Sequence, residues 1–307
     1  MVPPMHSRSN AALLTVFCLV LVACGSTPEK QNSRTEQANK LSARADAAFL
    51  QGDYEKARND YLQALRINQS VENTAALAII RFNLARVFRE LAHPEQAHLQ
   101  LDALFSESVL PYPPATLAAA AGLKSQFYFE GNEPSQALSW VEKGEGYCQK
   151  NCPVAGSLLL LRARLAQRDN RLDEALKFAD GAVSALNSGA QQIELANAQR
   201  LSGEISLAKN DLARAIQSFQ QALAIDQKLG LPGKIRLDLL RLGAAYERAG
   251  EAKTALQFYA RALTVSDAMG SVQGADEVRG YLKSLQKAPE TITPEVKTPE
   301  VKISVQR

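Results

Sequence analysis

One alanine recurs along this chain at a nearly constant interval, and that interval limits the folds open to it. The six copies are 40, 40, 38, 40 and 40 residues apart, at Ala57, Ala97, Ala137, Ala175, Ala215 and Ala255. A period of roughly 20 to 50 residues is typical of repeat architectures, in which one supersecondary unit is stacked many times. We therefore expect an elongated stack in place of the one or two globular domains that 307 residues otherwise suggest.

Small residues mark two further positions in every copy. Those twelve residues before the alanine are Ala45, Ala85, Ser125, Ala163, Gly203 and Gly243. Those five residues before it are Gly52, Ala92, Asn132, Asn170, Asn210 and Gly250. The first set lets two helices approach closely, and Gly or Asn in the second tolerates the left-handed backbone that ends a helix. With residues at offsets 0, 4, 7 and 8 on one helical face, each copy predicts a helix–turn–helix hairpin.

These positions resemble the tetratricopeptide repeat, most clearly in residues 242–263 and again in residues 51–65. The family's unit is usually about 34 residues long, whereas this one has about 40. The resemblance implies an all-α fold, a right-handed superhelical solenoid of six antiparallel helix pairs over residues 41–287. A capping helix is expected at 272–287, because the last hairpin cannot bury its apolar face alone. Pro111, Lys124 and Gly144 predict local irregularity around the third copy.

The first 23 residues have the layout of a secretory signal peptide, with His6 and Arg8 ahead of an apolar stretch. That stretch has about 13 residues, fewer than the roughly 20 that span a membrane. Leu21-Val22-Ala23-Cys24 resembles the lipobox of bacterial lipoproteins. The resemblance implies lipidation of Cys24 and, because Gly25 is not aspartate, anchoring in the outer membrane facing the periplasm. An ordinary signal peptide with an incidental cysteine is the alternative.

The two ends of the mature chain lack the pattern of a folded core. Residues 24–40 are polar and predict a flexible tether behind the lipid. Residues 288–307 contain Thr-Pro-Glu-Val-Lys twice and carry no net charge. Their regularly spaced prolines prevent a helix, so we expect a disordered tail. It is either an idle terminus or an extended strand that binds through its valines.

Cys148 and Cys152 are the two cysteines left after signal removal and lipidation of Cys24. One helical turn brings residues at this spacing to about 6 Å, so an oxidising compartment predicts a disulfide. A redox-active pair is the alternative, although the spacing is not Cys-x-x-Cys. A zinc site is a weaker one, because His93 and His98 are about fifty residues away in sequence.

Residues that carry out catalysis are scarce. No Gly-rich phosphate loop, paired-cysteine metal motif or His-Glu-x-x-His motif occurs. His93 and His98 are five residues apart and so lie on different faces of any helix. We therefore expect no catalytic residue, metal, cofactor or small-molecule substrate. A net charge of +3 is too balanced for a nucleic-acid binder.

The inner face of such a solenoid is lined by the first helix of each hairpin. The family resemblance places eight partner-binding side chains there, Phe82, Arg86, Arg89, Leu160, Arg164, Arg200, Leu240 and Glu247. Four of them are arginines, whose guanidinium groups suit carboxylates. The predicted ligand is an acidic peptide, a chain terminus or an anionic polymer strand. A solvated helix face without a ligand is the alternative.

Together these features predict a non-catalytic, lipid-anchored periplasmic scaffold that binds a protein or peptide partner. The lipoprotein and repeat resemblances imply a role in assembling a cell-envelope structure, such as a pilus or outer-membrane machinery. The alternative is a regulatory activator of a cell-wall-synthesising enzyme, acting through the tail at 288–307.

Overall fold

The computed structural model describes residues 33–106, 111–148, 150, 152–187 and 191–287. Within these ranges it contains thirteen helices and no strand. The helices are α1 (Ser33–Leu50), α2 (Tyr54–Ser70), α3 (Thr74–Glu90), α4 (Pro94–Phe105), α5 (Pro114–Glu130), α6 (Pro134–Tyr147), α7 (Ala155–Arg168), α8 (Leu172–Leu186), α9 (Gln192–Ala208), α10 (Leu212–Leu229), α11 (Pro232–Arg248), α12 (Ala252–Ala268) and α13 (Val272–Lys287). The all-α fold predicted from the repeat is confirmed.

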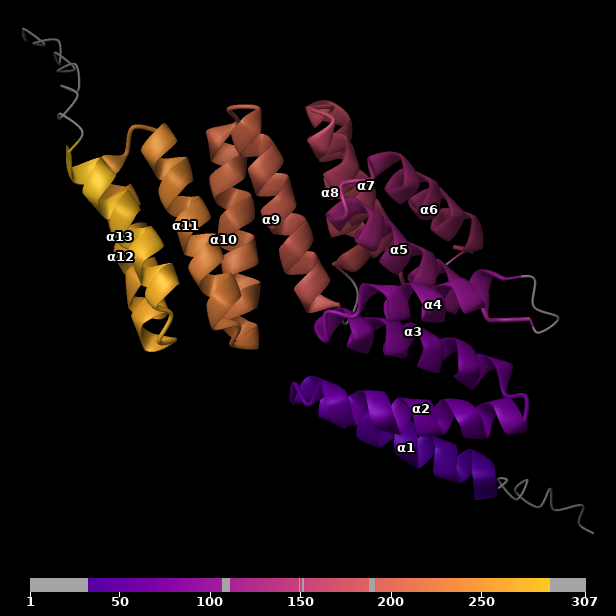
Figure 1. The fold of residues 1–307 in the computed structure, drawn as a ribbon. Coiled ribbons are helices and arrows are strands. Elements are labelled where there is room, and N and C mark those ends of the chain that lie inside the picture. The colour runs from indigo at the N-terminus through magenta and orange to yellow at the C-terminus, as the bar shows by residue number, and fades with distance from the viewer. Residues whose placement is uncertain (1–32, 107–110, 149, 151, 188–190, 288–307) are drawn as a thin grey trace, which may run out of the picture.

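The helices form a single stack of hairpins. Each odd-numbered helix from α1 to α11 packs against the even-numbered helix that follows it, and α13 packs on α12 at the end of the stack. Figure 1 shows the stack bending, with α1–α4 running across the view and α9–α13 running nearly upright. The predicted solenoid of helix pairs is thus confirmed, and its bend brings the two halves to face one another.

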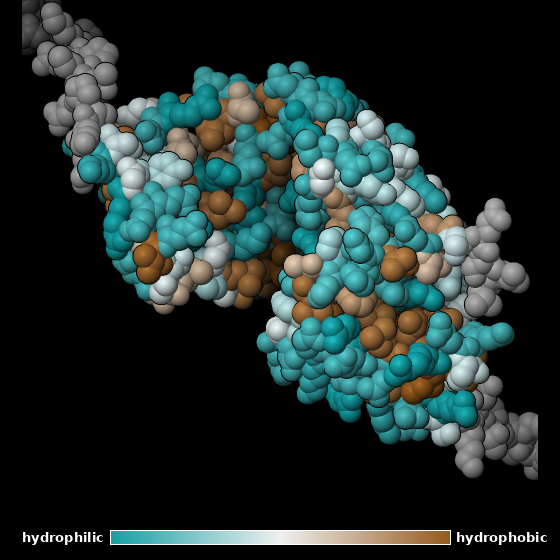
Figure 2. Space-filling model, in the orientation of Figure 1, coloured by the Kyte–Doolittle hydropathy of each residue, from teal (hydrophilic) through white to brown (hydrophobic). Residues whose placement is uncertain are grey.

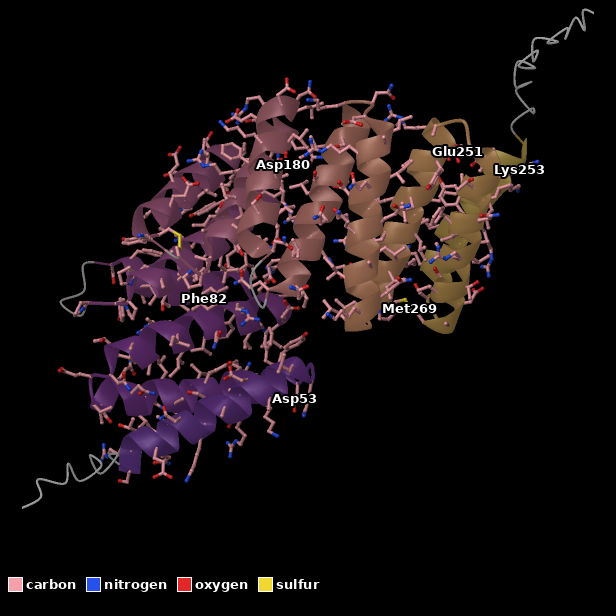
Figure 3. All side chains as sticks on the ribbon, turned by 180° about the vertical axis from the view of Figure 1, so that it is seen from behind. Asp53, Phe82, Asp180, Glu251, Lys253 and Met269 are labelled. Atoms are coloured by element: carbon pink, nitrogen blue, oxygen red, sulfur yellow. A yellow bond between two sulfur atoms is a disulfide. The ribbon has the colours of Figure 1, made fainter. Side chains whose placement is uncertain are left out.

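Successive helices alternate in direction, so every odd-numbered helix begins at the same edge of the stack. Glu251 precedes α12 and Met269 follows it, and Figure 3 shows these two residues at opposite edges of the last hairpin. Because the number of described helices is odd, Ser33 at the start of α1 and Lys287 at the end of α13 lie at opposite edges.

The turn inside every hairpin has the same backbone. All six residues at the predicted position have a positive φ, between 57° and 79°. Glycine adopts this region at little cost, and asparagine tolerates it. Ala92 is the exception in residue type, because it adopts φ 57° with a Cβ. Local sequence therefore fixes where each hairpin turns, and one turn carries strain.

The small residue twelve positions before each alanine lies against the partner helix. A Cβ added at Gly203 would lie 2.6 Å from Cε1 of Phe219, which is fully buried in α10. Gly243 approaches the Tyr259 ring in the same way in the next hairpin. Close packing of this kind explains why large aromatic residues and glycines occur together in these two hairpins.

The third hairpin is regular in itself, and the irregular backbone lies on either side of it. Helices α5 and α6 are continuous despite Lys124 and Gly144. A longer connection precedes α5, and a second one between α6 and α7 contains a disulfide that joins Cys148 to Cys152, with Cα atoms 5.2 Å apart.

The first helix begins earlier than the sequence predicts. The sequence predicts a flexible tether over 24–40, but residues 33–40 are helical, so this boundary is wrong. The polar side chains of this stretch face solvent and pair with one another, as Lys40 does with Glu36 at 2.7 Å, while Ala38 is buried. The predictions for the signal peptide, for Cys24 and for the tail fall on residues outside the described ranges. None of the helices described is long and apolar enough to cross a membrane.

Candidate binding groove

A groove of about 850 Å³ opens on the inner side of the bend. Its walls come from the first helices α1, α3, α5, α7, α9 and α11, with one residue from α2. Figure 2 shows the hollow between the two halves of the molecule, with hydrophobic residues in its depth. These are the helices that the hairpin repeat assigns to the inner face, so we name this hollow the concave groove.

The floor of the concave groove is apolar. It contains Phe49 of α1, Phe82 of α3, Leu123 of α5, and Leu158 and Leu160 of α7. Ala119 and Gly122 of α5 also line the groove, and these small residues leave space for a ligand beside the helix. Two of the residues predicted from sequence, Phe82 and Leu160, belong to this floor.

Cationic side chains line the groove around this floor. They are Arg86, Arg89, Arg164 and Lys234, against two lining carboxylates, Glu90 and Glu194. The Arg86 guanidinium lies 4.6 Å from the centre of the Phe49 ring and forms no ion pair within the described residues. Arg89 pairs with Glu130 at 3.3 Å, where both side chains are partly exposed, so that ion pair is weak. The groove therefore carries an excess of positive charge.

Arg164 is the least satisfied of these cations. Its side chain is half-buried, and burial lowers the pKa of its guanidinium. No hydrogen bond or ion pair to Arg164 is formed by any residue in the part of the chain that the structure describes. Glu204 and Glu130 act on it only through longer-range attraction, which opposes the effect of burial. A guanidinium that has lost water without a direct carboxylate contact is poised to bind an anion.

Lys234 completes the positive wall from the other half of the molecule. It lies in the first turn of α11, and its ammonium donates to Oδ1 of Asn197 at 3.4 Å. Burial lowers the pKa of this lysine, with a further lowering from Arg200. The bend therefore brings a cation from α11 to the same groove as those of α3 and α7.

The structure contradicts the prediction for Arg200. This residue is only 5% exposed, and its guanidinium contacts buried carboxylates between the helices instead of lining the concave groove. Its Nε donates to Asp238 of α11 at 2.6 Å, and Nη2 donates to Asp226 of α10. Burial raises the pKa of Asp238 to about 6, although the arginine opposes this shift. Arg200 therefore pairs with two buried aspartates and is not available to the ligand for which it was predicted.

Leu240 and Glu247 also lie away from the concave groove. Leu240 is buried in the core formed by α10, α11 and α12. Glu247 is exposed, and its carboxylate accepts a hydrogen bond from the Tyr259 hydroxyl at 2.9 Å. The predicted binding face is therefore restricted to Phe82, Arg86, Arg89, Leu160 and Arg164.

Phe49 and Lys234 are two of the lining residues that sequence reasoning missed. Phe49 stands eight residues before its alanine, the register of Arg89 in the next copy, so the repeat pattern contained the signal. Lys234 has no equivalent signal, because only the bend of the stack brings α11 to the groove.

The two histidines are separated in the structure. His93 is exposed at the N-terminus of α4, and His98 is half-buried beside Phe127 and Tyr128, with ring centroids 5.2 and 5.6 Å away. Burial lowers the pKa of His98. Over the described ranges, no group of three or more His, Cys, Asp or Glu residues is arranged to hold a metal ion.

Comparison with protein-family models finds a known type of repeat in two stretches of the chain. A tetratricopeptide-repeat family model matches residues 36–103, and a second such model matches residues 201–229. The search of curated proteins found no match to this chain. The first match covers nearly all of the first two hairpins, and the second covers the C-terminal part of α9 and all of α10.

Solved structures of low sequence identity share the fold. A signal-transduction ATPase with a tetratricopeptide-repeat sensor, from Pyrococcus horikoshii, superposes with a TM-score of 0.64 at 13% identity; 83% of this chain matches 38% of that protein's length. PilW, a widely conserved type IV pilus biogenesis factor, gives a TM-score of 0.60 at 15% identity, over 79% of this chain and 98% of its own. A Rap protein complexed with competence and sporulation factor gives 0.57 at 12% identity, over 82% and 71%. The chain thus carries tetratricopeptide repeats within an all-helical solenoid.

Proposed function

We propose that this protein is a non-catalytic scaffold that holds an acidic segment of a partner protein in the concave groove. One observation carries the proposal: Arg164 is half-buried with no hydrogen bond or ion pair among the described residues, and it shares the groove and its apolar floor with Arg86 and Arg89. An extended segment with carboxylates and apolar side chains would satisfy both features. The Rap protein, which shares the fold, was solved in complex with competence and sporulation factor, which supports a solenoid of this type as a binding surface.

The proposal includes a place in the cell. A lipid on Cys24 would hold the scaffold on the outer membrane with its groove in the periplasm, since two or three acyl chains anchor a protein stably. The shared fold of PilW, described as a pilus biogenesis factor, supports a role in assembling an envelope structure. Replacing Cys24 by Ala should abolish labelling with radioactive palmitate and move the protein to the soluble fraction. Persistent labelling would overturn the anchor at this residue.

In-cell photocrosslinking tests the groove. A photoreactive residue at Gln126, on the groove wall, should capture a partner, and Arg86→Glu combined with Arg164→Glu should abolish the crosslink. Arg66→Glu is the matched control, because Arg66 is exposed on α2 and lines no part of the groove. An unchanged crosslink in the double variant would contradict groove binding.

Deletion of residues 288–307 separates this proposal from the alternative of a tail-driven enzyme activator. A scaffold that binds through its concave groove keeps the Gln126 crosslink after the deletion. An activator that binds through the tail loses its partner instead.

A further inference from the structure

A cation recurs in the stack thirteen residues before the repeated alanine, between successive second helices. In the third hairpin Lys124 pairs with Asp102 of α4, and its ammonium lies 4.3 Å from the centre of the Trp140 ring of α6. In the fourth hairpin Arg162 of α7 forms a bidentate ion pair with Glu145 of α6, at 2.8 and 2.7 Å, and its Nη2 also lies 3.6 Å from Glu142 of the same helix. Figure 1 places α6 beside α7. Each cation therefore ties the second helix of the preceding hairpin to its own hairpin.

An aromatic residue completes this arrangement from the other side. Trp140 and Phe178 each stand three residues after the repeated alanine of their hairpin. The Arg162 guanidinium lies 5.7 Å from the Phe178 ring of α8, matching the contact of Lys124 with Trp140. Acid, cation and ring thus fill the gap between α4 and α6, and again between α6 and α8.

At the fifth hairpin the preceding helix α8 again supplies an acid, but serines stand at the cation and ring positions, and Arg214 of α10 pairs with the acid from another position. Asp180 of α8 is five residues after its alanine, the register of Asp102 and Glu142. Ser202 stands at the cation position, and Ser218 stands at the ring position. In the second and sixth hairpins the cation position holds fully buried leucines, so the fifth copy alone has a short side chain there.

An open groove of about 990 Å³ lies between α8 and α10 at this point, and we name it the α8–α10 groove. Ser202, Ser218 and Asp180 line it, together with the apolar side chains of Leu195 and Ile225. Both serines are nearly buried, at 3% and 6% exposure, and neither hydroxyl forms a hydrogen bond among the residues placed in the structure. The narrow side chains of the fifth copy therefore open a space that larger ones close elsewhere.

The charge of the α8–α10 groove is opposite to that of the concave groove. Asp180 and Asp211 supply two lining carboxylates, against one cation, Arg214, which reaches Asp180 from the rim. Gln217 and Gln221 add neutral amides at the exposed rim. Figure 3 shows Asp180 apart from Phe82 of the concave groove, on a different hairpin.

We propose that the α8–α10 groove binds a peptide segment of a partner in which a lysine or arginine stands beside an aromatic residue. The partner's cation contacts Asp180, whose side chain remains 47% exposed beside Arg214. The partner's ring packs over Ser218, as Trp140 and Phe178 pack within their own hairpins. Arginine and aromatic side chains are also the residues that most often dominate binding energy at protein interfaces. This site is separate from the concave groove and selects the opposite charge.

Peptide titration tests the site directly. The probe is a blocked hexapeptide, acetyl-Ala-Ala-Arg-Phe-Ala-Ala-amide, followed by NMR of the purified protein. We expect amide shifts concentrated in α8–α10 and at least tenfold weaker binding when glutamine replaces the probe's arginine. Equal binding of the two peptides, or shifts concentrated in the concave groove, would overturn the proposal.

Two sets of variants locate the probe. Ser202→Arg with Ser218→Phe rebuilds the internal pair, and should raise the melting temperature while weakening probe binding at least tenfold. Ser139→Arg, at an exposed position on α6, should leave binding unchanged. Asp180→Asn removes the carboxylate without adding bulk and should also weaken binding tenfold. Wild-type affinity in either folded variant would overturn the proposal.

Discussion

The arginines of the first helices differ in their ion pairing between the two halves of the stack. In the first half, Arg86 and Arg164 line the concave groove without an ion pair among the described residues. In the second half, Arg200 is enclosed by Asp226 and Asp238. Arginine thus stays unpaired at the groove in one region and joins helices in the other, and the difference depends on whether neighbouring hairpins supply acids in direct contact.

Substitution of Arg200 is expected to have the largest effect on stability. Replacing it with methionine leaves two buried aspartates without a counter-charge, so we expect the free energy of unfolding to fall by about 3–5 kcal/mol. Urea denaturation at pH 7 measures the loss. A loss below about 1 kcal/mol would show that water or another cation replaces the guanidinium, and the comparison would fail.

The buried aspartates should also make the second half sensitive to pH. The pKa of Asp238 is raised to about 6 from an ordinary 3.8, so the folded state binds the proton more tightly than the unfolded chain. This contribution to stability is complete below pH 3.8 and is lost as the pH rises through about 6. We expect about 2–3 kcal/mol less stability at pH 7 than at pH 4 from this group.

Asp238→Asn is the control for that pH dependence. It carries no titrating proton, so the slope between pH 4 and 7 that Asp238 causes should disappear from urea midpoints. A slope as steep as that of the unmodified protein would assign the effect to other groups.

The hairpin turn at Ala92 in the first half and the equivalent turn at Gly250 in the second half should differ in backbone strain, with a smaller effect on stability. Ala92 adopts φ 57° and Gly250 adopts φ 77° at equivalent positions. Ala92→Gly should raise the free energy of unfolding by about 1 kcal/mol, because it relieves the left-handed strain of a Cβ. Gly250→Ala should lower it by a similar amount. Thermal denaturation of both variants checks the pair, and equal signs would contradict the argument.

The smallest expected effect is at Arg164, and it sharpens the contrast with Arg200. Arg164→Met removes an uncompensated, half-buried charge, so stability should change by less than about 1 kcal/mol. The same variant should lose the crosslink from Gln126. A large loss of stability would mean that Arg164 holds the stack together, as Arg200 does.

The features predicted best from the sequence are those that depend on the backbone of a single hairpin. Residue types at fixed offsets located the turns, the close helix contacts and the inner-face positions such as Phe82 and Arg86. They did not predict the burial and ion pairing of Arg200, because its partners Asp226 and Asp238 are 26 and 38 residues away and lie on neighbouring helices. Contacts between hairpins depend on how the stack bends, and no local pattern encodes that bend.

The odd number of described helices decides at which edges of the stack the described chain begins and ends. With six hairpins alone, both ends would lie at one edge. The added helix α13 moves Lys287 to the edge opposite Ser33, a shift of about 25 Å along a helix of this length. The two ends of the described chain therefore differ both in the hairpin that carries them and in the edge at which they lie, so the stack is asymmetric from end to end.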